Sequence, residues 1–335
     1  MTNRTGFFLG LALLSQIAFP HHARTNYQGE VQEITGELVS FQWRNPHISF
    51  NVKATNNRGE EVLWKMEAGS IYMLQRAGVT DDLFTVGERV SVIGKESTRQ
   101  TRNLLATNML FPNGKEAVIM PNTDPYWTGE HIGGRDQWAL DEIKVKDTAS
   151  QNKGIFRVWS VTGGIRGDRR HVLFTESAIA ARTAWDPTDN FAIRCEQPGM
   201  PRSMTGPHPL QFLDQGDSLL VQIEENDVVR TIHMDQTETQ EEQPATPQGY
   251  SVGHWENNML IVETTRINWP WFDGVGTPQS EQIKTVEHFT LSEDQSRLDY
   301  HLTIVDPETF TEPAIIELYW LALGETVEPY DCEIN

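Results

Sequence analysis

The alternation of apolar and polar residues along the chain defines two separate β regions. In the first region, alternation runs through 29–43 in two short stretches, resumes over 48–54 and returns over 61–67. A period of two is typical of strands that bury one face. Turn residues at 56–59 separate the second stretch from the third. These stretches predict three successive strands, with the third returning along the second.

The rest of the first region completes the pattern of a small barrel. A short helix is expected over 70–77, with Ser70 as its N-cap and Gly78 as its stop. Two further strands are expected over 89–95 and 104–110. Five strands with one helix between the third and fourth is the order of an OB-type barrel. We therefore predict a mainly β protein whose residues 27–119 form an OB-like barrel.

A second β region follows a connector over 120–154, which is rich in proline, glycine and charge. A helical pattern occupies 175–185, and short strands separated by polar turns then follow in quick succession. We expect eight of them, over 210–213, 218–224, 228–234, 251–255, 259–265, 283–291, 297–305 and 315–322. This pattern predicts an antiparallel meander over 155–335 that forms a calycin-like barrel or half-barrel. A flatter curved sheet with a covering segment is the alternative.

The first 23 residues have the pattern of a secretory signal. A polar start with Arg4 is followed by an apolar run over 7–19 and by the small residue Ala23. The apolar run is shorter than the roughly 20 residues that a membrane-spanning helix needs. We therefore predict a signal peptide over 1–23, a periplasmic or secreted location and no transmembrane segment.

Length and charge narrow the class of protein further. The 335 residues suffice for about two domains. The 47 acidic residues outnumber the 27 basic ones, and the net charge is −20. Such a field repels phosphate backbones and anionic membrane surfaces, so we expect no nucleic-acid partner. The sequence identifies no protein partner.

Cys195 and Cys332 are the chain's two cysteines. In an exported protein such a pair is a candidate disulfide, and two separate buried thiols are the alternative. Their spacing does not fit a CxxC redox or zinc site.

Several short motifs resemble those of one family. The N-terminal ones are Gly36-Glu-Leu-Val, Trp43-Arg-Asn-Pro-His47, Trp64, Glu67 and Leu74-Gln-Arg-Ala-Gly78, which resemble the exported bacterial DUF6152 type, a family of unknown function. The C-terminal half resembles the segment fused to that domain in its relatives, through Arg194-Cys195, Pro198-Gly-Met-Pro-Arg202, Ser251-Val-Gly-His-Trp-Glu256, Leu260-Ile-Val-Glu-Thr264, Asp306-Pro307 and Tyr330-Asp-Cys-Glu333. The resemblance implies export, two β domains and pairing of the cysteines, and it implies no reaction.

Histidine and carboxylate residues provide candidates for proton transfer. His254 and Glu256 would share one face of a strand, whereas Glu287 and His288 would point to opposite faces. A carboxylate beside an imidazole can orient the ring and raise its basicity, so His254, Glu256 and Glu287 are the candidate catalytic residues. The other candidate histidines of this half are His208, His233 and His301. Structural histidines with satisfied hydrogen bonds are the alternative, because the sequence has no nucleophile elbow, Walker loop or zinc-protease motif.

The aromatic residues Trp255, Trp269, Trp271 and Phe272 are the candidate ligand-binding set. The last three lie in a long irregular connection between strands, where they can line a ligand site. Their alternative role is a lid folded back over the core. The preferred hypothesis is that the C-terminal domain binds a small hydrophobic or amphipathic ligand. A cofactor-free acid/base enzyme, such as a hydrolase, isomerase or dehydratase, is the alternative.

A third hypothesis is a metal-handling or scaffold protein. If signal cleavage exposed His21 as the N-terminus, its amine and ring could chelate Cu²⁺, with His22 or His47 adding a nitrogen. Cleavage after Ala18 or Ala23 fits the small-residue rule better than cleavage after Pro20. A solvated terminus and a structural role for His47 are the alternatives. We expect no cofactor, with copper as the exception that this hypothesis allows.

Overall fold

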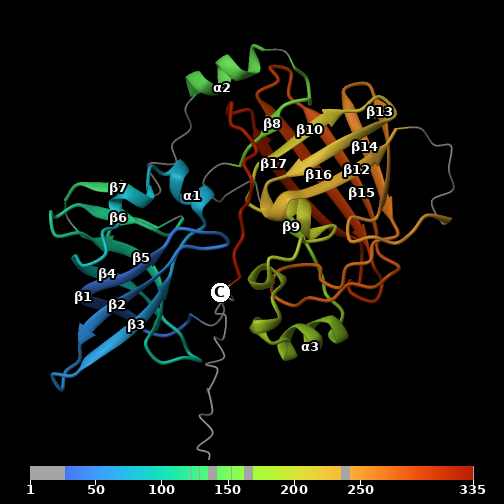
Figure 1. The fold of residues 1–335 in the computed structure, drawn as a ribbon. Coiled ribbons are helices and arrows are strands. Elements are labelled where there is room, and N and C mark those ends of the chain that lie inside the picture. Colours follow the sequence, from blue (N-terminus) through green and yellow to red (C-terminus); the bar gives the residue numbers. More distant parts are fainter. Residues whose placement is uncertain are drawn as a thin grey trace, which may run out of the picture.

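Strands dominate the computed structural model of the protein, at 42% of residues against 13% in helices. The structure describes residues 27–121, 123–127, 129–134, 142–151, 153–161, 169–234 and 242–334. The predicted signal peptide, with His21 and His22, lies outside these residues. The two β domains stand next to each other, and the C-terminal tail runs between them (Figure 1).

The N-terminal domain is a closed five-stranded barrel, which confirms the predicted OB-like fold. Its sheet has the order β3-β2-β1-β4-β5, and a parallel pairing of β3 with β5 closes it. The helix α1 lies between β3 and β4 in the sequence, as expected. The elements are β1 (Val31–Gln42), β2 (Ser49–Thr55), β3 (Glu61–Glu67), α1 (Ile71–Arg76), β4 (Arg89–Glu96) and β5 (Asn103–Leu110). Two short strands beyond the barrel, β6 (Glu116–Val118) and β7 (His131–Gly133), extend the sheet from β5.

Close approach of strands explains how so short a barrel closes. At Gly94 the pairing of β4 with β5 shifts register, and a Cβ there would lie 2.2 Å from the Leu105 carbonyl oxygen. Only glycine permits that approach. The inward faces of the strands then meet in a core that includes Leu38, Val52 and Leu104, each fully shielded from solvent.

The C-terminal domain is a nearly closed nine-stranded barrel, so the barrel prediction is confirmed. The sheet order is β8-β10-β11-β12-β13-β14-β15-β16-β17, with β9 added beside β17, and a bridge between Ser160 and Leu321 joins its ends. The strands are β8 (Val158–Trp159), β9 (Arg169–His171), β10 (Leu210–Asp214), β11 (Ser218–Ile223), β12 (Val228–His233), β13 (Tyr250–Glu256), β14 (Met259–Thr265), β15 (Lys284–Leu291), β16 (Arg297–Val305) and β17 (Ala314–Leu321).

One pair in this barrel departs from the predicted antiparallel meander. β12 and β13 pair in parallel, through Ile232 with Ser251 and His233 with Val252. A parallel pair requires a connection far longer than a hairpin turn. The stretch 234–249 supplies that connection.

Two longer helices accompany the strands. α2 (Glu142–Ala149) precedes the barrel, and α3 (Glu176–Ala184) follows β9. Thr175 is the N-cap of α3, since its hydroxyl accepts a hydrogen bond from the Ala178 amide at 3.2 Å. The helix expected over 175–185 is therefore confirmed. No helix within the described ranges is long and apolar enough to cross a membrane.

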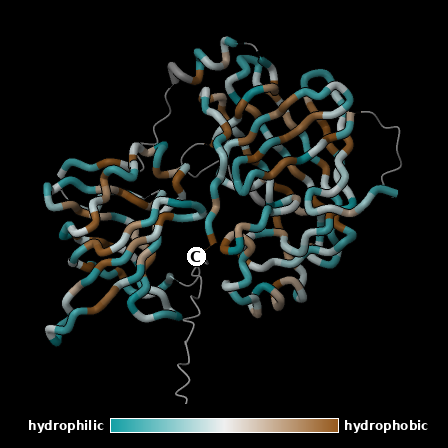
Figure 2. Tube along the Cα trace, viewed as in Figure 1, coloured by the Kyte–Doolittle hydropathy of each residue, from teal (hydrophilic) through white to brown (hydrophobic). Residues whose placement is uncertain are grey.

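Side chains fill the interior of the C-terminal barrel. Hydrophobic residues gather inside both domains, and hydrophilic ones lie on the loops (Figure 2). In the C-terminal core, Trp159 and Phe212 are fully buried, and Phe289, Trp320 and Tyr300 are at most 2% exposed. Large aromatic rings therefore occupy the space that a calycin-type ligand cavity would need.

A disulfide holds the C-terminal tail in place. Cys195 and Cys332 are bonded, with 5.8 Å between their Cα atoms, which confirms the predicted pairing. Beyond the barrel the tail reaches the N-terminal domain, where Cys332 forms a parallel β-bridge with Asn45 and Glu333 pairs with Arg44 at 3.0 Å. The tail around Cys332 thus contacts the loop between β1 and β2, and the disulfide anchors this tail to the C-terminal domain.

Candidate functional site

The structure separates the three predicted catalytic residues. His254 and Glu256 share a face at the end of β13, as predicted, with His254 Nε2 3.5 Å from Glu256 Oε1. Both side chains are open to solvent, at 41% and 57% exposure. Glu287 faces the barrel interior, where its carboxylate is fully shielded. The three residues therefore form no common site.

Glu287 belongs to a polar network inside the barrel. Its oxygens receive hydrogen bonds from both terminal nitrogens of Arg230, one of them at 2.9 Å, and from the Tyr300 hydroxyl at 2.8 Å. Ser251 and Thr264 accept two further hydrogen bonds from the Arg230 guanidinium, at 3.1 and 2.8 Å. The Arg230 guanidinium compensates the charge of this carboxylate and the hydrogen bonds hold it in place, which is a structural role.

The predicted aromatic residues form a cover over one part of the barrel. Phe272 is buried and packs against Phe310, with ring centres 5.0 Å apart. Trp269 contacts Phe191 at 5.3 Å, and Trp271 contacts Trp185 at 6.3 Å. These contacts match the lid alternative. Trp255 lies on β13, is 44% exposed and takes no part in these ring contacts.

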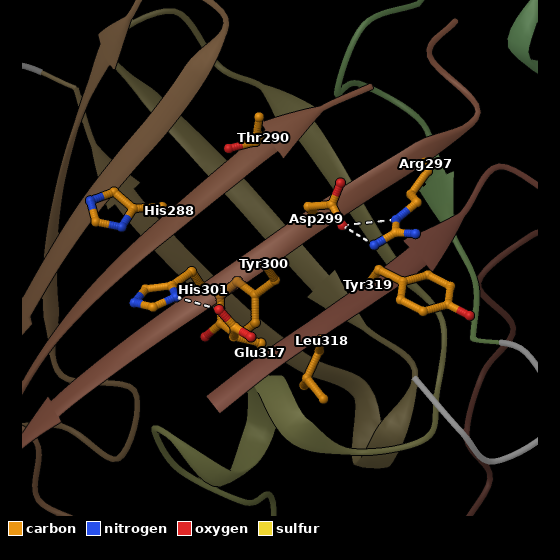
Figure 3. A pocket seen from close by; sticks show the side chains of 9 residues that line it. All are labelled: His288, Thr290, Arg297, Asp299, Tyr300, His301, Glu317, Leu318 and Tyr319. Atoms are coloured by element: carbon orange, nitrogen blue, oxygen red, sulfur yellow. Dashed lines mark hydrogen bonds and ion pairs between the residues drawn. The ribbon is translucent and has the colours of Figure 1, made fainter. Parts of the chain in front are cut away.

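A polar pocket of about 410 Å³ lies on the outer face of β15, β16 and β17 (Figure 3). His288, His301 and Glu317 occupy one row across it, because His288 pairs with His301 and His301 pairs with Glu317 in the strand registers. The ring centres of His288 and His301 are 5.8 Å apart, and His301 Nδ1 lies 3.4 Å from Glu317 Oε1. Two imidazoles and a carboxylate can transfer protons or ligate a metal ion.

An ion pair closes the other end of this pocket. Arg297 Nε donates to Asp299 at 2.8 Å, and its guanidinium stacks over the Tyr319 ring at 4.2 Å (Figure 3). Arg297 and Asp299 compensate each other's charge. The histidine and carboxylate side chains of the pocket that remain outside this ion pair are therefore His288, His301 and Glu317, which we call the histidine row.

A larger cleft of about 700 Å³ lies between the two domains. The loop after β1 supplies Trp43 and Asn45, α1 supplies Ile71 and Gln75, and the tail supplies most of residues 328–333. Domain interfaces are a preferred place for small-molecule sites, and this one combines an indole, an aliphatic chain and amides. The cleft exists only because the tail returns to the N-terminal domain.

Acidic groups dominate the charge of the cleft. Glu328, Asp331 and Glu333 line it against the single cation Arg44, which already pairs with Glu333. Asn45 is 8% exposed; its Nδ2 donates to the Tyr330 carbonyl at 2.5 Å, and its Oδ1 has no partner among the described residues. The cleft lining therefore places an acidic part beside an apolar one.

The described residues hold no ready metal centre. Within them, no group of three or more histidine, cysteine, aspartate or glutamate side chains is placed to hold a metal ion. His47 lies half-buried in the loop between β1 and β2. His21 and His22 lie outside the described residues, so the copper hypothesis stays a prediction.

Sequence reasoning identified part of these sites. His288 and His301 were among the candidate histidines, and Trp43 and Asn45 lie in a motif that carries the family resemblance. Glu317 was missed, although a charged residue inside the apolar run 315–322 is a visible signal. The tail that forms the cleft wall carries the motif Tyr330-Asp-Cys-Glu333, but nothing in the sequence indicated that it would lie beside Trp43 and Asn45.

The fold and the cleft define a two-domain β protein with an OB-type barrel and a larger, nearly closed barrel. Residues 10–105 match the model of DUF6152, a family of unknown function, which is consistent with the resemblance of the N-terminal motifs. No curated protein matches the chain.

Proposed function

We propose that this protein binds a small amphipathic, positively charged molecule in the cleft between its two domains. The observation that carries the proposal is the 700 Å³ cleft, whose wall joins the Trp43 indole and the Ile71 side chain to three carboxylates. The indole and the aliphatic chain would cover the apolar part of the ligand, and the carboxylates would attract its cation. The sequence placed the ligand within the C-terminal domain. The filled barrel interior favours the cleft instead.

We place this activity outside the cytoplasm. The Cys195–Cys332 disulfide supports an oxidising compartment, where such bonds form and persist. The signal-like pattern of the first 23 residues supports export in the same direction. A periplasmic or secreted binding protein meets its ligand by diffusion, which suits a cleft open to solvent.

Three probes with the same alkyl chain test the ligand class. Dodecyltrimethylammonium, dodecanol and dodecanoate, each below its micellar concentration, differ only in the charge of the head group. Calorimetric titration of the oxidised mature chain should give the highest affinity for the cation and the lowest for the anion, because the cleft is acidic. Equal affinities, or no heat of binding with any probe, would overturn the proposal.

Two variants locate the binding. Trp43→Ala should weaken the cationic probe by about tenfold, a typical loss for a buried aromatic contact. Trp255→Ala is the matched control, because Trp255 is an exposed tryptophan on β13, outside the cleft lining, and its removal should leave the affinity unchanged. Asp331→Asn should lower the affinity a few-fold for the cationic probe and leave the affinity for the other two probes unchanged. Asp331 has a positive φ, which asparagine tolerates. An equal loss in the Trp255 variant would place the binding elsewhere.

A proton-transfer enzyme is the second candidate function, and the His301–Glu317 pair favours it. This pair has the separation of a hydrogen bond and lines a pocket, whereas the predicted His254–Glu256 pair does not line that pocket. Esterase and lactonase activity of the purified chain would test it. His301→Ala should abolish such activity and His254→Ala should leave it intact. The reverse result would restore the original assignment.

A further inference from the structure

The row of His288, His301 and Glu317 has a geometry that neither ligand binding in the cleft nor the fold requires. All three side chains point outward from adjacent strands into the pocket (Figure 3). His301 and Glu317 are 38% and 43% exposed, so the row supports no core packing. The two imidazoles are therefore accessible to a ligand, and the sheet holds them at a fixed separation.

We propose that His288 and His301 bind one divalent transition-metal ion, of the class of Zn²⁺, Ni²⁺ or Cu²⁺. A metal–nitrogen bond of about 2.0–2.1 Å places the ion about 3.2 Å from the centre of each ring, so bond angles at the ion from about 90° to about 180° separate the two ring centres by about 4.5–6.4 Å. The observed separation of 5.8 Å lies in this range. The antiparallel register of β15 and β16 sets it, because the two residues are direct cross-strand partners.

Glu317 would select the ring nitrogen that His301 offers. Its Oε1 lies 3.4 Å from Nδ1, where the carboxylate accepts the Nδ1–H hydrogen bond. Nε2 then carries the lone pair, and the Thr303 hydroxyl at 3.3 Å donates to it in the absence of metal. A carboxylate behind a metal-bound imidazole orients the ring and raises its basicity. Glu317 is therefore a positioning residue and the two histidines are the ligands.

Water would complete the coordination of the ion. No third histidine, cysteine, aspartate or glutamate among the described residues converges on the pair, and Asp299 is already paired with Arg297. A two-histidine site binds metal more weakly than a closed four-ligand site and leaves positions open for exchange. Affinity should follow the preference of imidazole nitrogen, with Cu²⁺ above Ni²⁺ and Zn²⁺.

Metal titration of the untagged, oxidised chain tests the site. All variants are made with His21 and His22 replaced by alanine, which removes any chelation by the N-terminus. Calorimetry with Zn²⁺ and Ni²⁺, and the nitrogen splitting in the electron paramagnetic resonance spectrum of Cu²⁺, should show one ion per chain with two nitrogen ligands. His288→Ala and His301→Ala should each weaken binding at least about tenfold, and Glu317→Gln by about tenfold.

The control is His254→Ala, an exposed histidine on the same barrel with a carboxylate neighbour. It should bind metal like the parent chain, and near-ultraviolet circular dichroism should confirm that every variant is folded. Absence of binding in the parent overturns the proposal. Retention of two nitrogen ligands in His288→Ala or His301→Ala overturns it as well. Binding of the cationic amphiphile in the cleft should be the same in all these variants, so the two proposals succeed or fail separately.

Discussion

Arg230 and Glu287 form an ion pair inside the C-terminal barrel, and both side chains are completely shielded from solvent. Arg230 approaches from β12 and Glu287 from β15, and Tyr300, Ser251 and Thr264 accept or donate the remaining hydrogen bonds. Removing two charges from water costs several kcal/mol for each ion, and only such complete hydrogen bonding offsets it. The pair therefore joins β12 to β15 across the barrel interior.

Breaking this pair from one side should destabilise the barrel strongly. Glu287→Gln leaves the Arg230 charge buried without its counter-ion, which costs about 3–5 kcal/mol of unfolding free energy. Urea titration followed by near-ultraviolet circular dichroism measures the loss. The double variant Arg230→Met, Glu287→Leu should lose less than the sum of the two single variants.

The matched control for that experiment is Glu317→Gln on the outer face of β17. Its side chain is 43% exposed and pairs only with His301 at a long distance, so the change should stay within about 0.5 kcal/mol. If Glu287→Gln were as mild as Glu317→Gln, the interior pair would not hold the barrel together.

Buried tyrosines should make the protein sensitive to alkaline pH. Burial is the largest cause that raises the pKa of Tyr27, Tyr72, Tyr300 and Tyr330 above the ordinary value of about 10, and nearby carboxylates add to it. Below pH 10 these phenols keep their protons in both states. Above it, only the unfolded chain releases them, so the unfolding free energy falls as the pH rises.

Phenolate absorbance against pH measures this effect. Of the seven tyrosines, these four should ionise only together with the loss of near-ultraviolet circular dichroism. Free titration of all seven while the dichroism stays native would contradict the prediction.

Local periodicity was sufficient to predict most strands of this protein. β3, β14 and β16 have the predicted bounds. β16 alternates most cleanly between polar and buried apolar positions. The same periodicity placed Glu287 and His288 on opposite faces. The periodicity did not show which of the two faces lies inside the barrel. Glu287 lies in the interior because it pairs there with Arg230, which is 57 positions away in the sequence.

The candidate sites depend on pairings that no local pattern encodes. The histidine row requires the registers of three strands, and the register of a strand is set by its partners and turns. The cleft requires the contact of Asn45 with Tyr330, 285 positions apart. The sequence therefore identified His288, His301 and the motif around Asn45 as candidates. It did not predict that Glu317 lies beside His301 or that the tail lies beside Asn45.

Removal of the disulfide should open the cleft before it affects the barrel. The tail has few strand pairings of its own, and the bond from Cys332 to Cys195 ties it to the body of the C-terminal domain. Cys332→Ser should weaken binding of the cationic amphiphile at least about tenfold and lower the unfolding free energy by about 2–4 kcal/mol. Hydrogen exchange of residues 324–334 should accelerate while that of β14 and β15 stays slow. Unchanged exchange of the tail would show that its other contacts hold it.

The contacts of Arg76 should stabilise the relative placement of the two domains. This residue ends α1; its Nε lies 2.9 Å from Glu325, and its terminal nitrogen Nη1 donates to the Val161 carbonyl and to the Tyr72 hydroxyl. The Arg76 and Glu325 side chains are 20% and 18% exposed, so water competes little for these contacts. Arg76→Ala should weaken the cationic amphiphile several-fold, raise the radius of gyration in small-angle scattering and speed proteolysis within 120–154. Arg297→Ala is the control, because its ion pair with Asp299 lies wholly on the outer face of the barrel. A variant of Arg76 that scattered and bound like the control would show that other contacts, such as Tyr72 with His208 and Arg99 with Asp186, keep the domains in place.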